Sequence, residues 1–325
     1  HLQPLPSSRF LCAVSPSSTA AATPRSSTIT ILSTPLRVHP LGVDRSPPSL
    51  SWTRPRLRRG SRMASRWLVY TVSTGGYDVE PASELRLSDA DMAGVDFIRF
   101  VDEQSLSKLA GRPSRWRSVS LNSSSSPADR DAPQRLSRDL KIRPHRFPAV
   151  WRYDGSLYVD SNVRIHQRVW PLLYKLVLNS TDLAAYDFGR DLAGEAAWVR
   201  RYLLSRTVRF RSAEARAWLN HSLEQQVARY RRHGDHLWNR TMYGKVLLRR
   251  HNACMRTFGD LWWQEYTNGV PRDQLSLRYC TREANRRCGL RFTSLGWNGR
   301  HGPRFYRYFQ VHFSPNQKGR LAGFR

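Results

Sequence analysis

The feature that most constrains this chain is a short apolar segment, residues 156–159, that ends directly on Asp160. The segment is aromatic and β-branched and carries no charge, which predicts a buried strand. In an open α/β sheet, ligands bind outside the carboxyl ends of the strands, so an acid at this point faces the crevice. Such a carboxylate suits a divalent cation that carries a diphosphate. The alternative is that Asp160 begins a turn in which Asn162 is a local cap.

Short apolar segments alternate with helical patterns through the middle of the chain. We expect strands at 66–72, 95–101, 116–121, 156–159, 183–188 and 243–248, and helices at 168–179, 192–204, 212–232, 253–266 and 271–279. This alternation predicts an α/β fold with a mostly parallel sheet flanked by helices.

The net charge of +28 is concentrated at the two ends of the chain. Residues 1–62 and 283–325 each carry a net charge of +8, which leaves +12 for residues 63–282. We expect residues 1–62 to be disordered, or an upstream or transit-like segment, because they are rich in Ser, Thr, Pro and Arg and precede Met63. Residues 63–282 form the expected α/β domain, and residues 283–325 a basic C-terminal tail.

The basic flanks raise the possibility of nucleic-acid binding, but no recognition motif accompanies them. We therefore expect no specific nucleic-acid partner. No run of about 18 apolar residues is present, so we expect no transmembrane segment.

The four cysteines contain no CxxC pair, which argues against a zinc site. Cys280 and Cys288 could pair in an oxidising compartment, although nothing in the sequence requires it. Four Asn-x-Ser/Thr sequons favour the secretory pathway, in particular the Golgi lumen, over the cytoplasm.

Two further segments follow predicted strands. Gly75 and Gly76 come after the first strand, where small residues let backbone N–H groups approach a nucleotide; an ordinary glycine turn is the alternative. Asp102 ends the second strand, where it could meet a ribose or base, or cap the turn.

Several motifs occur in order over residues 66–280. They are Tyr70-Thr71 with Gly75-Gly76-Tyr77-Asp78; Ser137-Arg138-Asp139 with Lys141-Ile142-x-Pro144-His145; Tyr158-Val159-Asp160-Ser161-Asn162; Leu248-Arg249-Arg250-His251; Trp262-Trp263-x-Glu265; and Arg272-Asp273-Gln274-Leu275-Ser276. With this set the chain resembles the family known as domain of unknown function 616, the glycosyltransferase-like domain of plant mucilage and turgor-regulation proteins. The resemblance implies a GT-A-like nucleotide-sugar fold and an enzyme that transfers a sugar to a glycan or another hydroxyl acceptor.

The resemblance also implies roles for individual residues. Asp160 stands at the position of the metal-holding acid for Mn²⁺ or Mg²⁺, and Asn162 replaces the second acid. Asp273 or Glu265 would be the catalytic base, unless Asp273 only stabilises the first turn of a helix. The nucleotide would contact Tyr70, Thr71, Gly75, Gly76, Tyr77, Asp78 and Asp102. Substrate groups would contact Arg138, Lys141, His145, Asp154, His251, Trp263, Arg272 and Gln274. His251 has an alternative as a structural histidine at a strand end.

Two other function classes are alternatives, of which only the first would use the same Asp and His groups. A metal-dependent hydrolase is the first, but HExxH and GxSxG motifs are absent from the sequence. A nucleic-acid-binding protein held by its basic flanks is the second.

Overall fold

The computed structural model describes residues 67–76, 87–111, 114–121, 132–169, 180–206, 212–235, 239–297 and 307–311. All of them belong to one compact unit, Arg45–Arg325. The expectations for residues 1–62 and for Tyr77 and Asp78 lie outside the described residues, as do residues 170–179 of the helix expected at 168–179.

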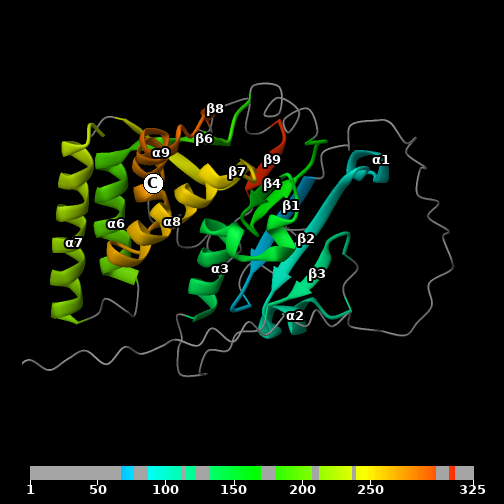
Figure 1. The fold of residues 1–325 in the computed structure, drawn as a ribbon. Coiled ribbons are helices and arrows are strands. Elements are labelled where there is room, and N and C mark those ends of the chain that lie inside the picture. The colour runs from blue at the N-terminus through cyan, green and yellow to red at the C-terminus, as the bar shows by residue number, and fades with distance from the viewer. Residues whose placement is uncertain are drawn as a thin grey trace, which may run out of the picture. The chain divides into compact units, whose positions relative to one another are not determined.

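A seven-stranded sheet forms the centre of the unit (Figure 1). Its strands are, in spatial order, β3 (Arg117–Ser120), β2 (Val95–Val101), β1 (Trp67–Ser73), β4 (Gly155–Val159), β7 (Arg240–Arg250), β6 (Leu183–Asp191) and β8 (Phe292–Trp297). Only β7 runs antiparallel to its neighbours, β4 and β6. The other pairs are parallel, so the expected mostly parallel sheet is confirmed.

Helices flank this sheet (Figure 1). They are α1 (Asp89–Met92), α2 (Glu103–Leu109), α3 (Ala132–Ile142), the 3-10 turn η2 (Pro144–Arg146), α4 (Pro148–Trp151), α6 (Leu192–Arg206), α7 (Ala213–Arg232), α8 (Ala253–Asn268) and α9 (Asp273–Cys288). A small second sheet pairs β5 (Val163–Ile165) with β9 (Phe309–Val311). In the part of the chain that the structure describes, no helix combines the length and apolar character needed to cross a bilayer.

The central strands are buried on both faces, which explains their nearly continuous apolar sequences. Successive side chains of a strand point to opposite faces. Tyr158 of β4 therefore packs in one core cluster with Leu140 of α3 and Trp262 of α8. Its neighbours Leu157 and Val159 pack in the other cluster, which includes residues of β5 and β9.

The C-terminal part of the fold differs from the sequence-based expectation. Helix α9 continues to Cys288 instead of ending near Tyr279, and β8 and β9 join sheets although we assigned their residues to a basic tail. The tail interpretation is therefore wrong for residues 283–297. The arginines of residues 283–297 are exposed, while Leu277, Cys280 and Ala284 face the core at helical spacing.

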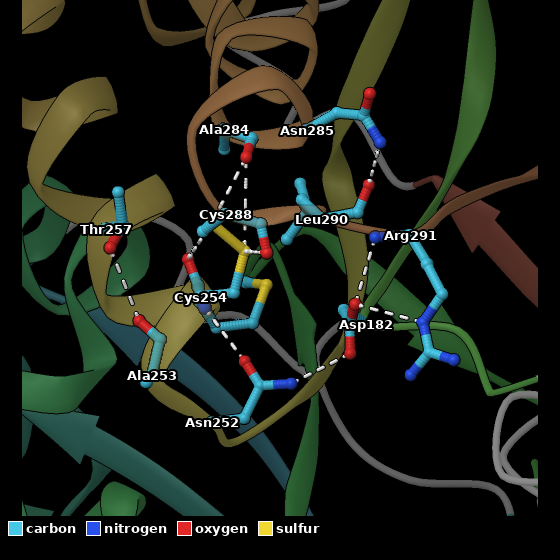
Figure 2. Close-up of a disulfide and its surroundings, with 11 residues drawn as sticks. Asp182, Asn252, Ala253, Cys254, Thr257, Ala284, Asn285, Cys288, Leu290 and Arg291 are labelled. Carbon is cyan, nitrogen blue, oxygen red and sulfur yellow. Dashed lines mark hydrogen bonds and ion pairs between the residues drawn. A yellow bond between two sulfur atoms is a disulfide. The ribbon is translucent and has the colours of Figure 1, made fainter.

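A disulfide joins Cys254, at the start of α8, to Cys288, at the end of α9 (Figure 2). The pairing of Cys280 with Cys288 that the sequence allowed is wrong, because Cys280 is a buried free thiol. Close to the disulfide, Asp182 accepts hydrogen bonds from Asn252 Nδ2 and from the Arg291 backbone N–H (Figure 2). The disulfide and this carboxylate thus hold the start of β6 together with segments from the last third of the chain.

Candidate active site

The order of the strands predicts a ligand-binding crevice between β1 and β4. The chain passes from β1 to β2 and β3 on one side, then returns to β4 on the other side of β1. Ligands of open α/β sheets bind outside the carboxyl ends of the strands at such a switch point. β1 ends at Ser73, shortly before Gly75 and Gly76, and β4 ends at Val159, directly before Asp160.

The glycine loop after β1 is held from within the protein. Gly75 and Gly76 both have φ of 68°, a conformation that favours glycine. The Gly75 N–H donates to Asp102 Oδ2 at 2.6 Å, and the Gly76 N–H donates to Ser105 Oγ at 3.0 Å. Asp102 also caps α2 by accepting from the Ser105 N–H. The cap alternative for Asp102 therefore describes its contacts, and the two glycine N–H groups are already bonded inside the protein.

The next two predicted nucleotide contacts lie in the core. Tyr70 is fully buried, and its hydroxyl donates to the Leu140 carbonyl and accepts from Arg249 Nη1 at 2.9 Å. Thr71 is 1% exposed. Both side chains are buried, so neither is exposed to a ligand at the edge of the sheet.

A cluster of charged side chains lies at the carboxyl end of β4, and we call Arg138, Lys141, Asp160, Asp273 and Lys245 the charged cluster. Lys141 Nζ lies 2.6 Å from Asp273 Oδ2 and 3.3 Å from Asp160 Oδ1. Arg138 Nη1 lies 3.4 Å from Asp273 Oδ2. Helix α3 supplies both cations, the end of β4 supplies Asp160, and the first residue of α9 is Asp273.

Lys245 of β7 completes the charged cluster. Its Nζ donates to Asn162 Oδ1 at 3.2 Å, and its backbone carbonyl accepts from the Asp160 N–H at 2.8 Å. The Tyr158 hydroxyl donates to Asp160 Oδ1 at 2.7 Å. The side chain of Tyr158 in β4 thus holds Asp160, and the side chain of Lys245 in β7 holds Asn162.

The members of the charged cluster differ in accessibility. The side chains of Lys141 and Asp273 are 2% and 4% exposed, whereas those of Asp160 and Arg138 are 20% and 26% exposed. A ligand in the crevice would therefore meet Arg138 and Asp160 before the buried pair.

The positive side chains keep both carboxylates ionised. Burial raises the pKa of Asp273, but Arg138, Lys141 and Arg272 outweigh it and hold that pKa far below its usual range. Burial likewise raises the pKa of Asp160, but Lys141, Lys245 and Arg138 bring it below the usual value despite the opposing charge of Asp273. A carboxylate with so low a pKa is a weak proton acceptor, which disfavours Asp273 as a general base.

A family model described as TOD1/MUCI70, glycosyltransferase-like domain, matches residues 62–293. The chain belongs to this family. The model does not carry the label domain of unknown function 616, but its description agrees with the glycosyltransferase-like class that the motifs implied. Among curated protein sequences, none matches the chain.

Solved glycosyltransferase structures resemble the fold of this TOD1/MUCI70 domain. The apo mouse xyloside xylosyltransferase 1 has a TM-score of 0.41 at 9% identity and covers 71% of this chain and 85% of its own. The galactosyltransferase LgtC, in complex with donor and acceptor sugar analogues, has a TM-score of 0.31 at 14% sequence identity. The match covers 66% of this chain and 69% of the LgtC chain. Core-mannan synthase A from Aspergillus fumigatus, in a form with Mn and GDP, has a TM-score of 0.34 at 8% sequence identity. The match covers 61% of this chain and 64% of the synthase chain. The expected α/β class, with a mostly parallel sheet flanked by helices, is confirmed by the strand order and the helices.

The residues predicted to hold Mn²⁺ or Mg²⁺ in this TOD1/MUCI70 domain are already occupied by positive groups. Asp160 Oδ1 accepts from the Tyr158 hydroxyl and Lys141, and Asn162 Oδ1 accepts from Lys245. A divalent and a monovalent cation about 4 Å apart repel by roughly 8 kcal/mol at an effective dielectric constant of about 20. Among the described residues, no group of three or more His, Cys, Asp or Glu side chains could hold a metal ion. This donor set does not fit a divalent cation.

Glu265, the other predicted base, lies in a different contact network. It accepts from the Tyr230 hydroxyl at 2.6 Å and from Gln226 Nε2 at 3.2 Å, and it pairs with Arg229. These three partners belong to α7, so Glu265 ties α8 to α7.

Arg272 and Gln274 flank Asp273 but make their own contacts. Arg272 Nε donates to the buried Glu195 Oε1 at 2.7 Å, and its guanidinium lies 4.3 Å from the centre of the Trp198 ring. It also donates to Gln274 Oε1. Gln274 is 6% exposed, and its Nε2 has no hydrogen-bond partner among the described residues. Arg272 thus contributes charge near Asp273, and its own side chain anchors α9 to α6.

His251 is held as a neutral structural histidine. Its Nδ1 lies 2.7 Å from the Tyr153 carbonyl, which can only accept, so Nδ1 carries the proton. Its Nε2 then accepts from Ser156 Oγ at 2.9 Å, and its ring stacks on Trp151. Burial is the main cause that lowers the pKa of His251 to about 4. The structural alternative describes these contacts.

The remaining predicted substrate residues also contact other parts of the domain. His145 Nε2 lies 3.1 Å from Asp260 Oδ1, and the Trp263 ring lies beneath the Arg143 guanidinium at 4.1 Å. The Asp154 carbonyl accepts from the His251 N–H at 2.8 Å. The structure therefore brings together Arg138, Lys141, Asp160, Asn162 and Asp273, and the other predicted substrate residues lie in separate contacts.

Lys245 and Tyr158 are site residues that the sequence reasoning missed. Lys245 is the one charged residue within the expected strand 243–248, and a buried strand disfavours a charge without a partner. That signal could have identified Lys245 as a residue with a specific partner.

Proposed function

We propose that this domain transfers a sugar from a nucleotide-diphosphate sugar to a hydroxyl group of a glycan or another acceptor. The observation that carries the proposal is the charged cluster at the switch point between β1 and β4, where three cations surround the accessible carboxylate of Asp160. Membership of a glycosyltransferase-like family supports the same conclusion.

The charged cluster suits the departure of a diphosphate. Transfer breaks the bond between the anomeric carbon and the diphosphate, so negative charge develops on the departing oxygen. Positive groups fixed in advance stabilise such charge most effectively. The side chain of Arg138 is more exposed than those of Lys141, Asp160 and Asp273. Its planar guanidinium can bind two phosphate oxygens at once.

The two carboxylates have a supporting role in this proposal. Asp273 holds Arg138 and Lys141 in place, and Asp160 holds Lys141 from the other side. Because its pKa is so low, Asp273 acts here as a positioning residue. It is not the general base that accepts the proton of the acceptor hydroxyl. In this proposal the side chains of the charged cluster, and not a metal ion, stabilise the departing diphosphate.

The secretory lumen is the proposed compartment, with the Golgi as the specific expectation. The disulfide between Cys254 and Cys288 supports this placement, because disulfides persist in oxidising compartments (Figure 2). The four sequons point the same way.

A thermal-shift screen of nucleotide sugars tests the proposed function. The full chain is heated with UDP-, GDP-, ADP- and dTDP-sugars, with and without the matching free nucleoside diphosphate as competitor. A donor at 100 times its dissociation constant stabilises the folded state by about 2.7 kcal/mol. We expect stabilisation by the sugars of one nucleotide. Identical melting temperatures with every donor at millimolar concentration would overturn the proposal.

A further inference from the structure

We propose that Lys141 and Lys245 take the place of a divalent cation at Asp160, so that the crevice binds a diphosphate without metal. The inference rests on the proposed function for the identity of the ligand. It follows from the disagreement between the expected Mn²⁺ or Mg²⁺ site and the groups that surround Asp160 and Asn162.

The two ammonium groups reach the end of β4 from different structural elements. Lys141 comes from α3 and contacts the Asp160 carboxylate, whereas Lys245 comes from the neighbouring strand β7 and contacts Asn162. Both also act electrostatically on Asp160. A diphosphate bound at residues 160–162 would therefore meet positive charge from both elements, as it would beside a bound cation.

Lys141 is fixed in this position by its other contacts. Its side chain is 2% exposed, its Nζ is 2.6 Å from Asp273 Oδ2, and it lies 5.2 Å from the centre of the Tyr158 ring. A charge held this firmly needs little reorganisation when an anion binds. Asp273 thereby keeps Lys141 beside Asp160, where a metal ion would otherwise stand.

The formal charges of the cluster favour an anionic ligand. Arg138, Lys141 and Lys245 are positive, and Asp160 and Asp273 are negative, which leaves one uncompensated positive charge. The ammonium group of lysine binds phosphate as a compact point charge. A divalent cation would add to the net positive charge of the cluster, whereas a diphosphate would neutralise that charge.

Lys245 is the residue on which the inference is best tested. It is half-buried, and its ammonium contacts an amide oxygen, so its loss leaves no carboxylate unpaired in that contact. Lys245→Gln removes the charge, and Lys245→Arg keeps it. Arg232→Gln is the matched control, because it removes one exposed positive charge at the end of α7.

The experiment measures binding of inorganic diphosphate to the full chain by isothermal titration calorimetry in excess EDTA, and again with Mg²⁺ or Mn²⁺. We expect binding in EDTA. Lys245→Gln should weaken it about tenfold or more, as loss of a hydrogen bond to a charged group implies. Lys245→Arg should bind much as the unmodified chain does, and Arg232→Gln should not change the affinity. Asp160→Asn should leave the response to metal unchanged.

Several results would overturn the inference. One is binding of diphosphate only when Mg²⁺ or Mn²⁺ is present. Another is tight binding of Mn²⁺ alone, detected by electron paramagnetic resonance and lost in Asp160→Asn. Equal affinity of Lys245→Gln and Arg232→Gln for diphosphate would do the same.

The inference and the proposed function fail in different ways. Sugar transfer that requires Mn²⁺ would overturn the inference and leave the function standing. Metal-free diphosphate binding that depends on Lys245, without transfer from any nucleotide sugar, would support the inference and overturn the function.

Discussion

Lys141 Nζ lies 2.6 Å from Asp273 Oδ2, and this ion pair joins α3 to the first residue of α9 in the interior of the domain. Both side chains are almost fully buried, so neither charge can turn to solvent when its partner is removed. The pair therefore couples the stability of the fold to the geometry of the candidate site.

Replacement of Lys141 by methionine should destabilise the domain strongly. Removal of one partner from a buried ion pair costs about 3–5 kcal/mol, because the other charge is left uncompensated. The residual contact of Asp273 with Arg138 places the expected loss at the lower end of that range. Urea denaturation followed by circular dichroism measures the change in the free energy of unfolding.

The double variant Lys141→Met with Asp273→Leu supplies the control for this interpretation. It should be more stable than Lys141→Met alone, because two apolar side chains replace the pair. A double variant that loses the sum of the two single effects would show that the residues act independently.

His251 should make the stability of the domain depend on pH. Its pKa is about 4 in the folded protein, where it is buried and neutral, and about 6.5 in the unfolded chain. Its contribution is complete above about pH 6.5 and is lost as the pH falls towards about 4, because the unfolded state takes up the proton first. The urea midpoint of the unmodified chain should fall over this interval more steeply than that of His251→Gln.

His221→Gln is the matched control for that experiment. His221 is an exposed residue of α7, so its replacement removes a histidine without disturbing the interior of the domain. A profile of His251→Gln that is parallel to that of the unmodified chain would contradict a buried neutral histidine.

The Cys254–Cys288 disulfide should contribute to stability, since it closes a loop over 34 positions. Loss of a cross-link of this loop length costs about 3–4 kcal/mol in the chain-entropy model. The variant Cys254→Ser with Cys288→Ser should lose this amount in urea denaturation under oxidising conditions. Addition of a reductant should lower the stability of the unmodified chain but leave the double variant unchanged. Equal stability of the two proteins before reduction would show that the disulfide does not form.

The sequence predicted the sheet better than it predicted the site. Strand β2 has the expected bounds, 95–101, and β4 extends the expected strand by one residue. Both are central strands buried on two faces, so their apolar runs stand out from the polar segments around them. Burial of this kind is visible in a local stretch of sequence.

Helix α3 was missed although its sequence contains a helical signal. Ala132, Leu136 and Leu140 recur at intervals of four, but charged residues between them drew attention to ligand binding instead. Helix α3 is the element that carries Arg138 and Lys141 to the end of β4. Without it, the two cations could be predicted as binding residues but not placed beside Asp160.

The pairing within the charged cluster is not encoded locally. Arg138 and Asp273 are 135 positions apart, and their contact depends on the packing of α3 and α9 against the same sheet. Lys245 comes from a third element, β7. The sequence around Asp160 predicted a metal ion because it does not show that Lys141 and Lys245, from distant parts of the chain, contact Asp160 and Asn162.

The most direct measurement of the central claim is the release of nucleoside diphosphate from a nucleotide sugar, followed by chromatography with and without acceptor glycans. The full chain is compared with Arg138→Gln and with the control Arg232→Gln. We predict release by the unmodified chain and by the control, and a decrease in kcat of about 10²-fold or more in Arg138→Gln, as loss of one charge-stabilising donor implies. Equal rates in Arg138→Gln and the unmodified chain, or no release from any donor, would contradict the account.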